Sequence, residues 1–125
     1  MSAPNIVGVT TITGITTYLS LSSTNPTLLV SNPASSNEVY KINSIIVAND
    51  SDTATGKVTI KYHDAAAGLG VSFSISKNVG VSSETTLVVL DRAAAIYLEE
   101  NRSISAQADT ADYLDVICSY ESIID

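Results

Sequence analysis

Strict alternation of apolar and polar residues is clearest in the stretch KVTIKYH, residues 57–63. A period of two predicts a β-strand with one buried face, because successive side chains on a strand point to opposite sides. The same alternation recurs in residues 71–76 and 114–120. The residues that we expect to point inward are Val58, Ile60, Tyr62, Val71, Phe73, Ile75, Leu87, Val89, Leu114, Val116, Cys118 and Tyr120. Lys57, Lys61 and His63 then face solvent.

Further strands are predicted where β-branched residues cluster, at 15–21, 27–30, 40–48, 85–90 and 103–108. Turn-forming residues separate the strands at 50–56, 64–70, 78–80 and 109–112. These connections are too short for crossover helices, and the one plausible helical turn is the Ala-rich stretch 91–95. The pattern predicts an all-β fold, an antiparallel β-sandwich of jelly-roll or Ig-like type with about eight strands.

The N-terminal stretch differs from the rest of the chain in its residue pattern. Gly8-Val9-Thr10-Thr11 and Gly14-Ile15-Thr16-Thr17 are near copies, but two units are too few for a β-helical repeat. We therefore expect an extended arm over residues 1–14 and a single sandwich domain over residues 15–125. The arm suits strand addition to a neighbouring subunit. The expected contact residues are Ile6, Val7, Val9 and Ile12 of the arm, joined by Ile123 and Ile124 near the C-terminus.

Composition narrows the classes of function. A chain of 125 residues fits one domain, and a net charge of −7 disfavours nucleic acid as a partner. One cysteine excludes an internal disulfide, so Cys118 is expected to be a buried apolar side chain. No apolar run is long enough to span a membrane and no basic leader is present, which predicts synthesis in a cytoplasm and no membrane partner.

Catalytic and metal-binding patterns are sparse. His63 is the one histidine, no Gly-x-Ser-x-Gly elbow is present, and Cys118 lacks a base on its side of the sheet. Residues 50–61 begin like a calcium loop but carry Thr55 and Lys61 where an EF-hand needs glycine and glutamate. The sequence predicts a protein that is not an enzyme and has no cofactor or metal site, with adventitious calcium at Asp109, Asp112 and Asp115 as the open alternative.

Five segments between residues 40 and 121 resemble small virion structural proteins of tailed bacteriophages, and those of marine and cyanobacterial phages most. The segments are YKINSIIVAN (40–49), VTIKY (58–62), TLVVLD (86–91), IYLEE (96–100) and DVICSYE (115–121). They keep the family's order over about two-thirds of the chain. Many family members carry Gly-Asp where this chain has Asn101-Arg102, a difference that affects one turn.

The resemblance implies a β-sandwich found in the virion and made in the host cytoplasm. Its partners would be further copies of itself, as a homo-oligomer, and other virion proteins such as the major capsid protein. The leading expectation is a capsid decoration or cement protein. A neck, tail or baseplate module and a carbohydrate-binding receptor module remain the alternatives, the last with Tyr97 and Tyr113 as candidate contacts.

Overall fold

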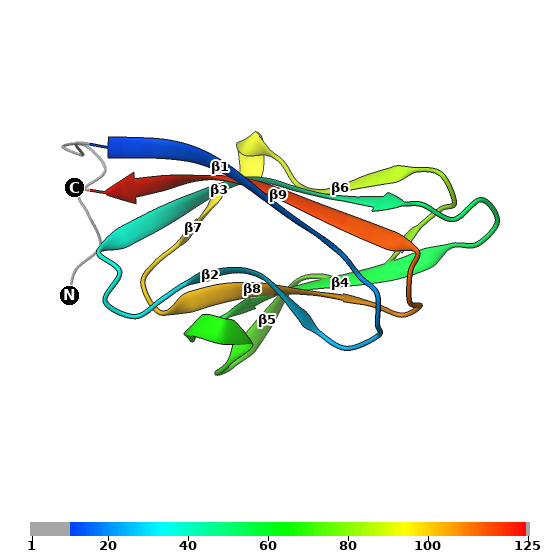
Figure 1. The fold of residues 1–125 in the computed structure, drawn as a ribbon, viewed down its shortest axis with the longest axis horizontal. Coiled ribbons are helices and arrows are strands. Elements are labelled where there is room, and N and C mark those ends of the chain that lie inside the picture. Colours follow the sequence, from blue (N-terminus) through cyan, green and yellow to red (C-terminus); the bar gives the residue numbers. More distant parts are fainter. Residues whose placement is uncertain (1–10, 125) are drawn as a thin grey trace.

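Two antiparallel sheets packed face to face form the molecule (Figure 1). The structure, a computed structural model, describes residues 11–124. Sheet A holds β1 (Thr11–Ser20), β9 (Leu114–Ile124), β3 (Glu38–Asn49), β6 (Thr86–Leu90) and β7 (Ile96–Leu98). Sheet B holds β2 (Thr27–Asn32), β8 (Arg102–Ala108), β4 (Gly56–His63) and β5 (Ser72–Val81). The expected antiparallel β-sandwich is confirmed.

The strand order identifies the sandwich type. Sheet A runs β1-β9-β3-β6 and sheet B runs β2-β8-β4-β5. The chain passes between the sheets at nearly every connection, and only β4–β5 is a hairpin between neighbours in one sheet. In an Ig-like sandwich several consecutive strands share a sheet, whereas this order is the double Greek key of a jelly roll.

Strands β6 and β7 act as one interrupted strand. Both pair with β3, β6 against residues 45–48 and β7 against residues 40–42. The 3₁₀ turn η2 (Arg92–Ala94) lies between them, and its first residue is preceded by Asp91, whose carboxylate accepts a hydrogen bond from the Ala93 amide at 3.0 Å. The Ala-rich stretch is thus a short 3₁₀ turn, and β7 is a strand that the sequence pattern did not predict.

The core lies between the sheets and draws residues from both. Its fully buried members include Ile42, Ile45 and Val47 of β3 and Ile104 and Ala106 of β8. Most of the predicted inward residues are buried or partly buried against this cluster: Val58, Ile60, Tyr62, Ile75, Leu87, Val89, Leu114, Val116, Cys118 and Tyr120. Cys118 is confirmed as a buried thiol.

Two inward predictions are wrong. Val71 and Phe73 are 60% and 59% exposed. Val71 precedes β5 in the connection from β4, and Phe73 lies on β5, the edge strand of sheet B, opposite Tyr62. An edge position has no further strand beside it, so alternation alone overstates burial there.

Three boundaries also differ from the sequence prediction. β5 continues through residues 78–80, where we expected a turn, because Asn78 takes a positive φ of 49° within an irregular β4–β5 pairing. β9 continues to Ile124 and β1 begins by Thr11, so residues 11–14 of the expected arm pair with β9 in sheet A. The remainder of the expected arm lies outside the described residues.

Buried asparagines secure the ends of two strands. The Asn32 amide nitrogen, at the end of β2, donates to the carbonyl oxygens of Glu38 and Leu98, each at 3.0 Å. The Asn49 amide nitrogen, at the end of β3, donates to the carbonyl oxygens of Ala54 and Val81, each at 2.8 Å. Each side chain thereby bonds two backbone carbonyl groups from different segments of the chain.

Candidate interaction surfaces

An apolar row crosses the outer face of sheet A. Tyr18 of β1 lies opposite Ile117 of β9, Ile117 opposite Ile46 of β3, and Ile46 opposite Val88 of β6. Directly opposed side chains in antiparallel strands are neighbours at about 5 Å, so these four form a continuous stripe. Tyr18 is 77% exposed, Val88 56% and Ile117 39%. We call these four residues the apolar row.

Polar side chains border the apolar row along the strands. One flank carries Ser20, whose hydroxyl donates to the Asp115 carboxylate. The other carries Thr16, opposite Ser119. Beside Tyr18 and Ile117 the surface is hollowed into a shallow pocket of about 290 Å³. An exposed apolar centre with an aromatic side chain and a polar rim is the composition of protein–protein contact surfaces.

The structure brings together two of the contact residues predicted from the sequence. Ile12 of β1 lies opposite Ile123 of β9, which lies opposite Val39 of β3. Ile12 is 53% exposed, whereas Ile123 and Val39 are buried. Ile124 lies opposite Thr11, so its side chain points to the other face of the sheet. Ile6, Val7 and Val9 lie outside the described residues.

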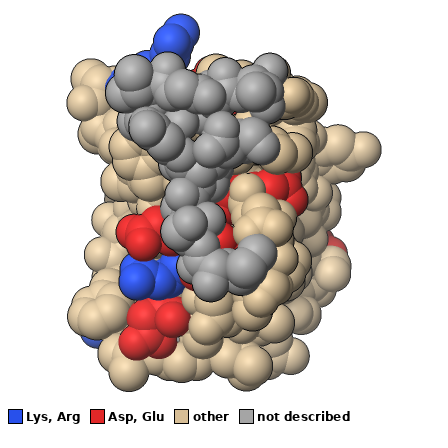
Figure 2. All heavy atoms as spheres, turned by 90° about the vertical axis from the view of Figure 1, so that its left-hand side faces the viewer, with Lys and Arg blue, Asp and Glu red and all other residues tan. Residues whose placement is uncertain are grey.

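At the end of the sandwich that carries the start of β1 and the end of β9, acidic and basic side chains lie next to one another among uncharged ones (Figure 2). The pairing of Lys41 with Glu121 places opposite charges side by side on the outer face of sheet A, between the apolar row and Ile12. Ile12 and Ile123, which lie opposite each other, thus form a second apolar group that is separate from the apolar row.

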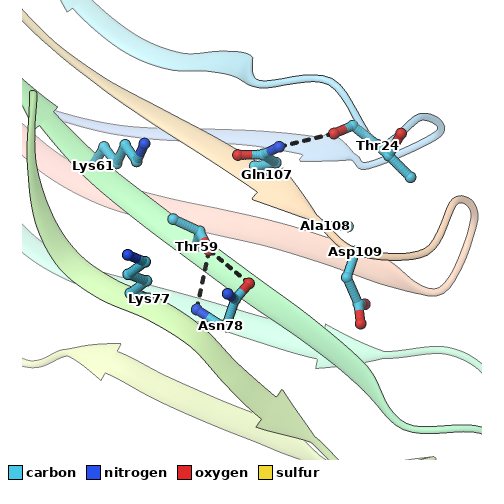
Figure 3. Close-up of a pocket in the computed structure, with 8 residues that line it drawn as sticks. All are labelled: Thr24, Thr59, Lys61, Lys77, Asn78, Gln107, Ala108 and Asp109. Atoms are coloured by element: carbon cyan, nitrogen blue, oxygen red, sulfur yellow. Dashed lines mark hydrogen bonds between the residues drawn. The ribbon is translucent and has the colours of Figure 1, made fainter.

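Sheet B presents a polar groove instead of an apolar row (Figure 3). The groove encloses about 410 Å³, with Lys61 and Lys77 toward one end and Asp109 toward the other. Gln107 Nε2 donates to the Thr24 carbonyl oxygen at 3.0 Å, and Thr59 Oγ1 accepts from the backbone N–H of Asn78 at 3.0 Å. The Lys61 and Lys77 ammonium groups can donate to a polar ligand, and the Asp109 carboxylate can accept from one.

His63 does not face solvent as predicted. Its side chain is 7% exposed, and Nε2 lies 2.7 Å from the Ser105 hydroxyl oxygen. The prediction is wrong because the β4–β5 connection, with its 3₁₀ turn η1 (Ala66–Gly68), folds back onto sheet B. There the Ser103 hydroxyl donates to the Ala65 carbonyl oxygen and accepts from the Gly68 amide.

The His63–Ser105 pair has the distance of a base and a hydroxyl nucleophile, but no carboxylate orients it. Within residues 11–124, His63 Nδ1 has no hydrogen-bond partner, and Ser105 is also buried. A catalytic histidine is usually oriented through its second ring nitrogen. The pair is a buried side-chain hydrogen bond beneath the β4–β5 connection.

The Cys118 thiol is also buried, and the Tyr40 and Tyr120 side chains are partly buried. Burial raises the pKa of the Cys118 thiol to about 12. Burial also raises the pKa values of Tyr40 and Tyr120, whose rings pack with centroids 4.9 Å apart. Across residues 11–124, no cluster of three or more His, Cys, Asp or Glu side chains is arranged to hold a metal ion. No helix in that range has the length and apolarity to cross a membrane.

Comparison with known proteins supports the fold. No family model and no curated protein matches the sequence. A subunit of Bacillus endospore appendages, described as disulfide-linked pili, superposes with a TM-score of 0.54 at 13% identity, covering 94% of this chain and 91% of that one. At this identity the likeness concerns the jelly-roll architecture alone.

Two phage capsid structures also contain chains similar in outline. A chain from the capsid of Helicobacter pylori bacteriophage KHP30 gives a TM-score of 0.46 at 8% identity, covering 94% of this chain and 90% of that one. A chain from the capsid of cyanophage Pam1 gives a TM-score of 0.38 at 11% identity, covering 100% of this chain and 93% of that one.

Proposed function

We propose that this chain is a structural protein of a tailed-phage virion and that it decorates or cements the capsid lattice. The apolar row carries the proposal. A jelly roll hosts unrelated functions, so a surface indicates the function of this chain better than its fold does. The sequence resemblance to small virion proteins supports the same conclusion.

The apolar row suits a protein partner because it is contiguous and its members Tyr18, Ile117 and Val88 are exposed. Complete burial of a fully exposed aliphatic side chain contributes about 1.5–3 kcal/mol before association costs, and the partly exposed Ile117 and Val88 contribute a share of that. The aromatic Tyr18, at the end of the row on edge strand β1, is the expected anchor. The partner under this proposal is the major capsid protein.

The test measures binding of the purified protein to particles that lack it. Tyr18→Ser should weaken binding at least tenfold, because the anchor of the row is removed. Phe73→Ser is the matched control, since Phe73 is an exposed aromatic on sheet B. Equal binding by both variants would contradict the proposal. Copy number then separates decoration, on the order of hundreds per particle, from a neck, tail or baseplate module at about a dozen or fewer.

A filament subunit is the second candidate, favoured by the Bacillus appendage likeness. Those appendages are described as disulfide-linked. In this chain the one cysteine, Cys118, is fully buried, so its subunits would have to join without that bond. Electron microscopy of concentrated protein tests this candidate, because regular filaments in the absence of particles would favour it over decoration.

The polar groove favours a carbohydrate-binding receptor module as a further alternative. Lys61, Lys77 and Gln107 offer donors to sugar hydroxyls. Glycan-array binding that is lost in Gln107→Ala and kept in Tyr18→Ser would support this reading. Tyr97 is 43% exposed, so it remains available as a contact residue.

A further inference from the structure

β1 is an edge strand of sheet A, and its outer edge is free along the described residues. It pairs with β9 alone, over ten residues and without a register shift. All of the residues from Thr11 to Thr16 are exposed. The first half of β1 is therefore held by backbone pairing on one side, with little side-chain burial.

The other edge strands carry features that discourage strand addition, and β1 does not. β6 has five residues, β2 has six and a register shift, and β5 has two register shifts and Lys77. Short length, bulges and lysines are the devices by which proteins protect sheet edges. β1, with the sequence TITGITTYLS, has no charge, no proline and no bulge.

The direction of the free backbone groups follows from a hydrogen bond at the end of β1. The Leu21 amide donates to the Leu114 carbonyl oxygen at 2.9 Å, toward β9. Successive amides of a strand point to opposite edges. The amides of Tyr18, Thr16, Gly14 and Ile12 therefore point away from β9, to the free edge.

We propose that two copies of this chain pair through β1, antiparallel about a two-fold axis at Ile15, and join their A sheets into one continuous sheet. In this register Ile12 faces Tyr18 of the second copy and Gly14 faces Thr16. These pairs are hydrogen-bonded, because their amides point to the shared edge. Ile15 faces Ile15 of the second copy, and this pair is not hydrogen-bonded.

A second copy fits this edge for reasons of charge and symmetry. A two-fold antiparallel contact pairs β1 of one copy with β1 of the other. A charged β1 would therefore bring like charges together. β1 is uncharged within a chain of net charge −7, and its exposed Ile12 and Tyr18 gain a cross-strand contact. The apolar rows of both copies then lie on one surface.

Sedimentation equilibrium of the isolated full chain tests the pairing. The wild type should be a dimer, and Thr16→Pro should raise the dissociation constant at least tenfold, because it removes an amide that points to the free edge but none that bonds β9. Thr16→Val, which keeps that amide, is the control and should dimerise like the wild type. A monomeric wild type, or a Thr16→Pro variant that dimerises as tightly, overturns the proposal.

Cross-linking tests the register and does not depend on whether the proline variant folds. Ile15→Cys should give a disulfide-linked dimer on mild oxidation, because its Cα atoms would lie about 4.5 Å apart in the non-hydrogen-bonded pair. Thr16→Cys should not, because it faces Gly14 of the other copy. Absence of cross-linking in both, or cross-linking of Thr16→Cys alone, overturns the proposal. Either result leaves the virion proposal standing, since particle binding through the apolar row is measured separately.

Discussion

His63 and Ser105 contact each other diagonally across strands β4 and β8, with the imidazole Nε2 2.7 Å from the hydroxyl oxygen. The contact lies beneath the β4–β5 connection, where Ser103 and Ser31 hydroxyls accept hydrogen bonds from the Gly68 and Ala67 amides. His63 lies on the polar face of β4, and the β4–β5 connection buries it there.

His63→Ala should lower the free energy of unfolding by about 1–3 kcal/mol, because it leaves the buried Ser105 hydroxyl without this partner. Urea denaturation measures the effect. The sequence pattern, with His63 in solvent, predicted less than about 0.5 kcal/mol. Lys57→Ala, on the same strand but exposed, is the control and should stay within that limit. An unchanged midpoint for His63→Ala would show that the buried contact contributes nothing.

Cys118 should make the protein sensitive to alkali. Burial raises its pKa from 9.0 to about 12, so the folded state keeps its proton while the unfolded state loses it. The stability from this group is fully present below pH 9 and is lost as pH rises toward 12, by about 1.4 kcal/mol per pH unit. Cys118→Ala should show a shallower decline over this range in denaturant titrations. The raised pKa values of Tyr40 and Tyr120 act in the same direction in both proteins.

The Cys118 thiol should also resist alkylation at pH 8 until the protein unfolds, because burial disfavours the reactive thiolate. Mass spectrometry after iodoacetamide treatment, with and without denaturant, distinguishes the two states. Rapid modification of the native protein would contradict the described burial.

Asn49→Asp should destabilise the fold by about 2–4 kcal/mol. The substitution keeps the shape but removes two donated hydrogen bonds, and it places a carboxylate against the carbonyl oxygens of Ala54 and Val81. Thermal unfolding at neutral pH measures the loss. Asn25→Asp makes the same chemical change at an exposed position and should leave the melting temperature nearly unchanged.

Deletion of residues 2–10 should leave a folded domain, because the buried core cluster begins at Leu21. Deletion of residues 2–13 should cost more, since it also removes the pairing of residues 11–13 with β9. Circular dichroism and thermal melts of the two variants compare the two effects. Weaker particle binding by the first variant, without loss of stability, would support the expected arm. Unfolding of the first variant would show that residues 2–10 belong to the domain.

The sequence by itself determined most of the strands and much of the core. Alternation is a local property, so Val58, Ile60, Val116 and Cys118 could be assigned to the buried face from neighbouring residues alone. Ile12 and Ile123 were selected as apolar residues near the ends of the chain, and only the β1–β9 register shows that they face each other.

Tertiary structure decided the features that depend on residues far apart in the chain. Burial of His63 depends on where a later connection folds, and exposure of Phe73 depends on β5 having a neighbour on one side only. The choice of a jelly roll over an Ig-like sandwich is a matter of strand order, which alternation does not encode. The apolar row joins residues 18, 46, 88 and 117, so it exists only because strand pairing aligns four segments that share no local pattern.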